Sequence, residues 1–318
     1  MGLIKEYASR GYGSSDTVVC HGCATDYALQ NFIKENGHLA TCDYCGSRRK
    51  CIGLEELMEP IMNGIRFEYT DAANELAYEG REGGYQGTVY DSDELIKDVL
   101  YKELGIEDDR LLDDISSLMD DVAWCERDYY WGREEDNAYY TWEDFCTLVK
   151  TKVRYVFYKV SDDLLTGSEP QPSEILEIIG SYVRKSNLIK ELNGKTTKLY
   201  RARTHKDEGG LKGAHEYFPP LPKQTKPYRM NPEGIPMLYL TYKPETAVRE
   251  VYSKKAKYAS VARYKLLRNF RVVDFTKPTN VQFPSLFDDE RRGRRAAMAF
   301  LRRFSEDISK PDARNKAV

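Results

Sequence analysis

Four cysteines near the start of the sequence have the spacing of a metal site. They form two Cys-x-x-Cys pairs, Cys20–Cys23 and Cys42–Cys45, separated by eighteen residues. Each tight turn of this kind directs two thiolates at one ion, and two such turns complete the tetrahedral shell that zinc prefers. Four thiolates leave no open position, so we expect a structural zinc that stabilises a small module. His21 and Cys51 are the alternative ligands in this segment.

A turn in the last third of the sequence begins a second group of residues that could do chemistry. Arg229 and Asn231 lie in this turn, which continues to Gly234 at a position that needs a positive φ. The apolar and aromatic run 235–242 follows, and it suits a short buried strand that carries Tyr239.

Two further elements would bring charged side chains to the same place. Residues 197–203 alternate as a strand does, which would place Arg201 and Arg203 on one face. Residues 246–252 favour a helix that carries one carboxylate, Glu250. The turn, the strands and the helix would then form one compact pocket. The alternative is the strand and helix of an ordinary α/β core with a glutamate on its surface.

The elements expected around these sites are mainly helical as far as residue 192 and mixed after it. Capping residues and glycines bound several of the helices. Helices are predicted at 26–36, 54–65, 92–104, 111–124, 142–158 and 173–183. Further on, strands are predicted at 259–266 and 270–275, paired with each other, and a long basic helix at 289–304. The arginines of that helix are interpreted as a solvated face; they are Arg291, Arg292, Arg294 and Arg295.

The net charge of −3 conceals opposite charges in successive parts of the chain. Residues 53–146 contain 27 acidic and 7 basic residues, a balance of −20, whereas residues 195–318 contain 28 basic and 13 acidic residues, a balance of +15. Opposite charges attract, so the acidic part could lie against the basic part; the alternative is two solvated surfaces. Near the cysteines the only cluster of basic residues is Arg48, Arg49 and Lys50, which favours a structural or partner-binding ribbon over a nucleic-acid reader.

Residues 199–311 resemble a RES domain, the toxin domain with an Arg-Glu-Ser motif found in bacterial toxin–antitoxin pairs. The resemblance rests on segments 200–203, 229–236, 238–240 and 246–250, with weaker matches at 272–275 and 307–311. The eleven-residue step from Tyr239 to Glu250 fits the tyrosine and the glutamate of that family. The ribbon and the helical segment resemble the amino-terminal domain, with a HEPN-related name, that accompanies some RES domains.

The resemblance implies a fold similar to ADP-ribosyltransferase toxins and a reaction that consumes NAD. Breaking the nicotinamide–ribose bond develops positive charge on the ribose, which a carboxylate such as Glu250 can stabilise. Arginine forks suit the diphosphate of NAD, and Tyr239 would stack on the nicotinamide or hold Glu250 in place. We therefore expect catalytic roles for Arg201, Tyr239 and Glu250, and dinucleotide binding by Arg203, Arg229 and Asn231.

These patterns predict an α+β chain of three parts. They are a zinc ribbon at 1–52, an acidic and mainly helical domain at 53–192, and a mixed α/β RES domain at 193–318. RES domains usually continue into a last strand with a Tyr-x-x-Thr/Ser-Gln element. The sequence shows no such element after its Asp-Ile-Ser-Lys-Pro stretch, so we expect this domain to lack its last strand and its activity to be affected.

The leading interpretation is an NAD-degrading toxin or phage-defence effector that acts as a glycohydrolase or a phosphorylase. The alternatives are an ADP-ribosyltransferase with a macromolecular target and a catalytically weak zinc-ribbon protein with a binding or regulatory role. The expected partners are NAD, an antitoxin or regulatory protein, and a second copy of the chain; nucleic acid is a less favoured alternative. No apolar run approaches the roughly 20 residues of a membrane helix and the first residues have no signal-peptide pattern, so the protein is expected in the bacterial cytoplasm.

Overall fold

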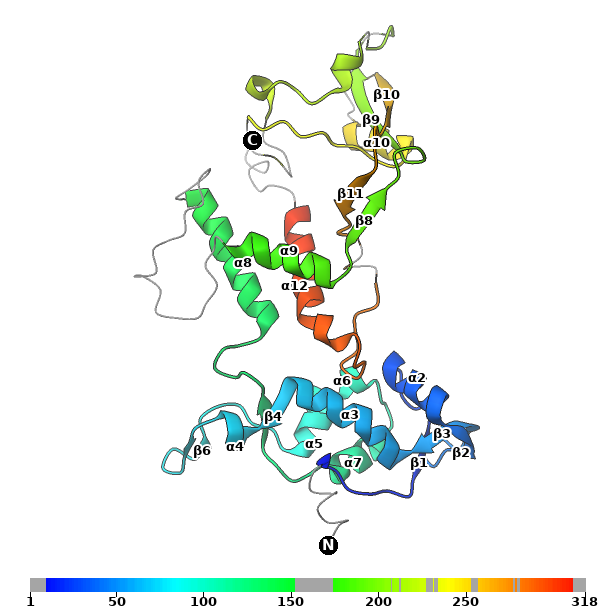
Figure 1. Ribbon diagram of the computed structural model, residues 1–318, viewed down its shortest axis with the longest axis vertical. Coiled ribbons are helices and arrows are strands. Elements are labelled where there is room, and N and C mark those ends of the chain that lie inside the picture. The colour runs from blue at the N-terminus through cyan, green and yellow to red at the C-terminus, as the bar shows by residue number, and fades with distance from the viewer. Residues whose placement is uncertain are drawn as a thin grey trace. The chain divides into compact units, whose positions relative to one another are not determined.

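The computed structural model of the chain consists of two compact units, each of which is described by itself (Figure 1). The N-terminal unit comprises Met1–Ile178 and Val281–Phe300, and the C-terminal unit comprises Ile179–Asn280 and Leu301–Val318. Among the residues that the structure describes, 44% are helical and 20% lie in strands, which confirms the expected mixture of the two. The structure describes residues 10–151, 174–206, 208–211, 213–226, 231, 234–252, 257–276, 278 and 281–310. Arg229 and the end of the predicted helix 142–158 lie outside these residues.

A three-stranded antiparallel sheet and one helix form the cysteine-containing part of the N-terminal unit. The strands are β1 (Val18–Cys20), β2 (His38–Thr41) and β3 (Arg48–Gly53), in the order β1-β3-β2. Helix α2 (Tyr27–Asn36) begins as predicted, because the carboxylate of Asp26 accepts hydrogen bonds from the amides of Ala28 and Leu29. It ends at Gly37, where a Cβ atom would lie 2.4 Å from the carbonyl oxygen of Ile33. This glycine is needed for a close approach of the backbone.

Short helices and small sheets make up the rest of this unit. They are α3 (Leu54–Glu68), β4 (Tyr69–Asp71), α4 (Ala72–Glu75), β5 (Tyr78–Glu79), β6 (Gly84–Tyr85), α5 (Ser92–Glu94), α6 (Tyr101–Leu104), α7 (Asp109–Leu118), β7 (Trp124–Glu126) and α8 (Glu134–Thr151). The predicted helix 92–104 contains a π-helical turn at Leu95–Val99 and ends, as expected, before a left-handed glycine, Gly105. The predicted helix 111–124 is wrong at its end, because α7 stops at Leu118 and Trp124 starts a strand paired with β4.

One hydrophobic core joins the sheet, the helices and the returning segment 281–300. Helix α3 contributes Leu57, Ile61 and Ile65 at helical spacing, all fully buried. Leu286 and Phe287, which come from far along the chain, are buried in the same cluster. The segment 281–300 is therefore a part of the N-terminal unit.

Arg295 corrects the expectation that the basic helix presents all four arginines to solvent. It is 9% exposed and begins α12 (Arg295–Ser309), which is preceded by a 3-10 turn at Arg292–Arg294. Its Nε lies 2.9 Å from a carboxylate oxygen of Glu68, and its Nη atoms lie 3.1 and 3.2 Å from the carboxylate of Glu103. A buried guanidinium is tolerated here because two carboxylates compensate for its desolvation.

The described part of the C-terminal unit contains two antiparallel strand pairs, the helices α9 and α10, and the second part of α12. Its elements are α9 (Ile175–Lys185), which starts in the other unit, β8 (Ile189–Leu192), β9 (Lys198–His205), α10 (Pro244–Val251), β10 (Tyr258–Lys265) and β11 (Phe270–Val273). The predicted pairing of the strands near 259–266 and 270–275 with each other is wrong. Strand β10 pairs with β9, and β11 pairs with β8. Between β10 and β11 the chain does not fold back into a hairpin; the side chain of Asn269 there accepts a hydrogen bond from the amide of Gly194, which lies between β8 and β9.

The segment 235–242 is not the predicted buried strand. Residues 235–240 form no ladder, and Ile235, Met237 and Leu238 are exposed. One isolated bridge, between Thr241 and Tyr200 of β9, attaches the segment to the sheet. The positive φ of Gly234, +82°, is confirmed.

Helix α10 begins two residues before the predicted range 246–252, with Pro244 in its first turn, where proline is well tolerated. Among the described residues, no helix combines the length and the apolarity that crossing a membrane requires.

Candidate active site and candidate metal centre

The four cysteines of the two Cys-x-x-Cys turns come together at one point. Their Sγ atoms all lie within 4.8 Å of one another. The Sγ distances from Cys20 to Cys23, from Cys20 to Cys45 and from Cys23 to Cys42 are 3.7, 3.5 and 3.6 Å. A tetrahedral zinc with bonds of about 2.3 Å to sulfur separates its ligands by about 3.8 Å, so the arrangement fits such an ion.

The surroundings of the thiols are consistent with this fit. Burial raises the pKa of Cys20 and of Cys23, whereas hydrogen bonds from Ser47 lower the pKa of Cys45 to about 6. A cation is the partner that would stabilise buried thiolates. The two alternative ligands are outside the group: Cys51 directs its Sγ at the carbonyl oxygen of Ala40, and His21 is not among the clustered residues.

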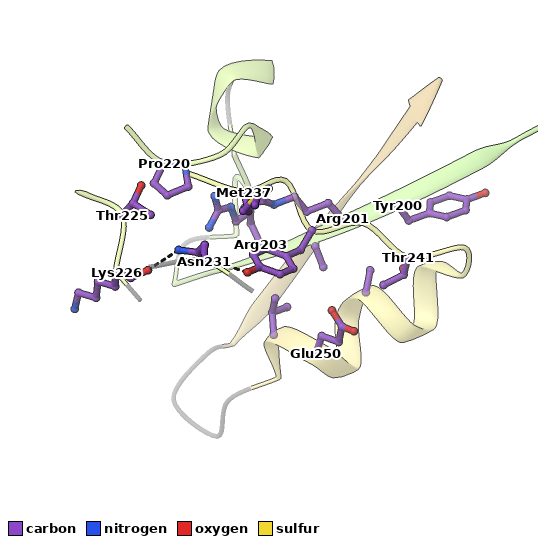
Figure 2. A pocket seen from close by; sticks show the side chains of 14 residues that line it. Tyr200, Arg201, Arg203, Pro220, Thr225, Lys226, Asn231, Met237, Thr241 and Glu250 are labelled. Atoms are coloured by element: carbon purple, nitrogen blue, oxygen red, sulfur yellow. Dashed lines mark hydrogen bonds between the residues drawn. The ribbon is translucent and has the colours of Figure 1, made fainter. Parts of the chain in front are cut away.

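A cavity of about 290 Å³ in the C-terminal unit brings together five of the six residues expected there (Figure 2). The sixth, Arg229, lies outside the described residues. Strand β9, the segments on either side of Gly234, and helix α10 supply the walls. The five residues are Arg201, Arg203, Asn231, Tyr239 and Glu250.

The two arginines are the donor side of this cavity. They lie two residues apart on β9, and the side chain of Tyr200, the residue before Arg201, points away from them (Figure 2). Nη1 of Arg201 and Nε of Arg203 are buried, and no described residue accepts a hydrogen bond from either atom. Burial, together with the neighbouring charge of Arg203, lowers the pKa of Arg201. Buried donors of this kind are usually paired, and the acceptor oxygens of an anionic ligand would satisfy them.

Tyr239 and Asn231 form a hydrogen-bonded pair on another wall. The hydroxyl of Tyr239 donates to Oδ1 of Asn231 at 2.7 Å. Nδ2 of Asn231 donates to the carbonyl oxygen of Lys226 at 3.1 Å, as Figure 2 shows. Asn231 is 6% exposed, so its amide is held in one orientation.

Glu250 comes from the last turn of α10. Ala247, one turn earlier on the same face, is buried, which fixes the helix against its surroundings. The carboxylate of Glu250 is an exposed acceptor on the cavity wall. The cavity thus offers cationic donors from a strand and a carboxylate from a helix.

Sequence reasoning missed the contribution of the loop before Asn231. Thr225 and Pro220 line the cavity, and the backbone of Lys226 holds Asn231. Thr225 is buried and donates its hydroxyl hydrogen to the carbonyl of Leu221. An irregular loop has no periodicity, so only its clustered prolines indicated a turn, and nothing in the sequence indicated where it would lie.

Comparison with family models gives two matches along the chain. A model described as HEPN/RES N-terminal domain 1 matches residues 35–163, and a model described as RES domain matches residues 198–313. The resemblance inferred from the sequence motifs is confirmed by these matches. The second match contains every residue of the cavity expected to act on a ligand. No curated protein and no solved structure matches the chain.

Proposed function

We propose that the cavity of the C-terminal unit cleaves the nicotinamide–ribose bond of NAD. The match of residues 198–313 to a RES domain supports this proposal, because the resemblance to RES domains implies a reaction on NAD. The observation that carries the proposal is the pair of arginines on β9, whose buried and unpaired donors an anion would satisfy. The diphosphate of a dinucleotide is such an anion, and guanidinium forks match its geometry.

The reaction follows from the other wall of the cavity. When the bond between C1′ of the ribose and the ring nitrogen breaks, the electron pair leaves with nicotinamide as a neutral group, and positive charge develops on the ribose. The carboxylate of Glu250 stabilises that charge. Water or phosphate then forms a bond to C1′ through oxygen and loses a proton to solvent, which gives ADP-ribose or its 1-phosphate. Tyr239 positions the dinucleotide for this step.

Product analysis tests the proposal and separates the possible acceptors. We would incubate the purified protein with NAD, with and without phosphate, and separate the products by chromatography. Nicotinamide with ADP-ribose indicates hydrolysis, and a phosphorylated ADP-ribose formed only with phosphate indicates phosphorolysis. Nicotinamide release that needs an added protein, which becomes modified, indicates ADP-ribosyl transfer. No release under any of these conditions would contradict the proposal.

We also propose that the four cysteines hold one structural zinc ion. The fit of the Sγ distances to a tetrahedral thiolate site supports it. Because Cys20 and Cys42 belong to the hydrophobic core of the N-terminal unit, the ion would stabilise that whole unit. Elemental analysis should give one zinc per chain, and a Cys23→Ser protein should contain much less. A wild-type protein that is fully folded without metal would contradict this role.

The biological setting that we propose is a toxin or defence effector of the bacterial cytoplasm, restrained by an antitoxin. Depletion of NAD would arrest the cell, so such an enzyme has to be controlled. Expression of the wild-type chain should lower cellular NAD and stop growth, and a Glu250→Gln chain at the same level should do neither. Growth arrest without loss of NAD would contradict this assignment.

A further inference from the structure

The pair formed by Asn231 and Tyr239 determines which atom of each residue is a donor. The carbonyl oxygen of Lys226 can only accept a hydrogen bond, so the atom of Asn231 that faces it, at 3.1 Å, must be Nδ2. Oδ1 of Asn231 therefore faces Tyr239, at 2.7 Å. An amide oxygen can only accept, so the phenol must be the donor.

In this arrangement the only proton of the Tyr239 hydroxyl is used in the hydrogen bond to Asn231 and is not available to a ligand. A phenol has one O–H donor, and it is directed at Asn231. Any hydrogen bond between Tyr239 and a ligand must then be donated by the ligand. The burial of Asn231 keeps this polarity fixed, because a buried amide cannot exchange its partners for water.

The residues of the cavity consequently fall into two groups of opposite hydrogen-bonding character. Arg201 and Arg203 can only donate, whereas Tyr239 and Glu250 can only accept while the carboxyl is ionised. We propose that Asn231 is a positioning residue that makes Tyr239 an obligate acceptor, and that Tyr239 selects dinucleotides carrying an N–H or O–H donor on their nicotinamide–ribose half. This inference rests on the proposed function, because it takes a dinucleotide as the ligand.

Two chemical groups of NAD could supply the donor, and analogues distinguish them. One is the carboxamide, whose N–H groups are absent from nicotinic acid adenine dinucleotide. The other is the ribose 2-hydroxyl, which fluorine replaces in the 2-deoxy-2-fluoro analogue. We would titrate NAD and both analogues by calorimetry into the full chain with Glu250→Gln, so that the bound dinucleotide is not consumed. In that protein, one analogue should bind at least about tenfold more weakly than NAD.

Substitutions at the pair separate a selective role from a structural one. When Tyr239→Phe is added, the affinity for NAD should fall by the same factor of about ten, while the affinity for the analogue that bound more weakly should not change. With Asn231→Ala added, the phenol proton can turn into the cavity, so the discriminated analogue should bind better than before. Tyr242→Phe is the matched control, because Tyr242 is an exposed tyrosine close in sequence and outside the cavity lining. It should change none of the three affinities.

The possible results separate this inference from the proposed reaction. Equal binding of all three ligands, or an equal loss for all three in both substituted proteins, would overturn the role of Asn231 and Tyr239 and leave the cleavage proposal standing. Selective binding by a wild-type protein that never releases nicotinamide would support the inference and contradict the proposed reaction. Absence of binding by every dinucleotide would overturn both.

Discussion

Arg201 shows how burial turns one side chain into a ligand-binding group. Its Nη1 has no acceptor among the described residues, and the neighbouring charge of Arg203 adds repulsion that an anion would relieve. We predict that Arg201→Lys weakens the binding of ADP-ribose by about tenfold to a hundredfold, because the ammonium group cannot reproduce the fork of the guanidinium. Calorimetry with ADP-ribose measures this affinity directly, because ADP-ribose lacks the nicotinamide–ribose bond and is not consumed during the titration.

The matched control for Arg201 is Arg263 on the paired strand β10. Arg263 is exposed and lies opposite Tyr200 in the register, so it occupies the other face of the two strands. Arg263→Lys should leave the affinity for ADP-ribose unchanged. Equal losses in the two variants would indicate a general effect of charge and not a specific contact.

Arg295 is a second arginine whose environment decides its contribution. Replacing it with alanine leaves the carboxylates of Glu68 and Glu103 without their shared partner in a partly buried place. We predict that Arg295→Ala lowers the free energy of unfolding by about 3–5 kcal/mol. Arg294→Ala, next to it but exposed, should cost less than about 0.5 kcal/mol. Denaturation by urea compares the two, and similar values would contradict the buried role of Arg295.

At the scale of elements, an ion pair links β8 to the end of β11. Nζ of Lys190 lies 2.7 Å from the carboxylate of Asp274, and this contact, with help from Thr276, lowers the pKa of Asp274 to about 2. The ordinary pKa of an aspartate is about 3.9, so the stabilisation is complete above that value and is lost as the pH falls through about 2. Because the Lys190 side chain is 37% exposed, we assign the pair about 1 kcal/mol at most.

The pH dependence of this pair is measurable with one substitution. Asp274→Asn should be less stable than the wild type by up to about 1 kcal/mol at pH 7, and the difference should shrink as the pH is lowered from 4 towards 2. Urea denaturation at several pH values gives both numbers. A difference that is constant over this range would show that the charge of Asp274 is not its cause.

Elements with local signals were predictable from the sequence, and those decided by distant partners were not. Helix α2 has its cap at Asp26, and α10 has Pro244 in its first turn, so both could be located. The end of α7 depends on the pairing of Trp124 with β4, and the partner of β10 is a strand more than fifty residues earlier. Neither pairing can be predicted from the local pattern of apolar and polar residues, because each depends on a strand that is distant in the sequence.

The same distinction holds for the candidate sites. The spacing of the Cys-x-x-Cys turns was sufficient to predict their cluster, since two tight turns fix four sulfurs. The alternation of β9 was sufficient to place Arg201 and Arg203 together. The carbonyl of Lys226, which holds Asn231, could not be predicted, because an irregular loop brings it there.

In the whole molecule, the segment 281–300 belongs to the last third of the sequence but packs in the N-terminal unit. The last third of the chain therefore needs that unit to bury its apolar residues. Leu286 and Phe287 are buried in the core of the N-terminal unit, and their removal from water contributes about 3–6 kcal/mol. We predict that a fragment of residues 193–318 exposes them and aggregates or binds a hydrophobic dye. Replacing both side chains with serine in the fragment should reduce this. A fragment that is monomeric and unfolds cooperatively would contradict the prediction.

The role of Glu250 is tested by the rate at which a Glu250→Gln protein releases nicotinamide from NAD. Glutamine keeps the shape of the side chain and removes its charge, so we predict that this rate falls at least about a hundredfold while the thermal unfolding of the protein is unchanged. Glu245→Gln, in the first turn of the same helix and exposed, should retain the wild-type rate. A Glu250→Gln protein that releases nicotinamide as fast as the wild type would contradict the claim that this carboxylate carries the chemistry.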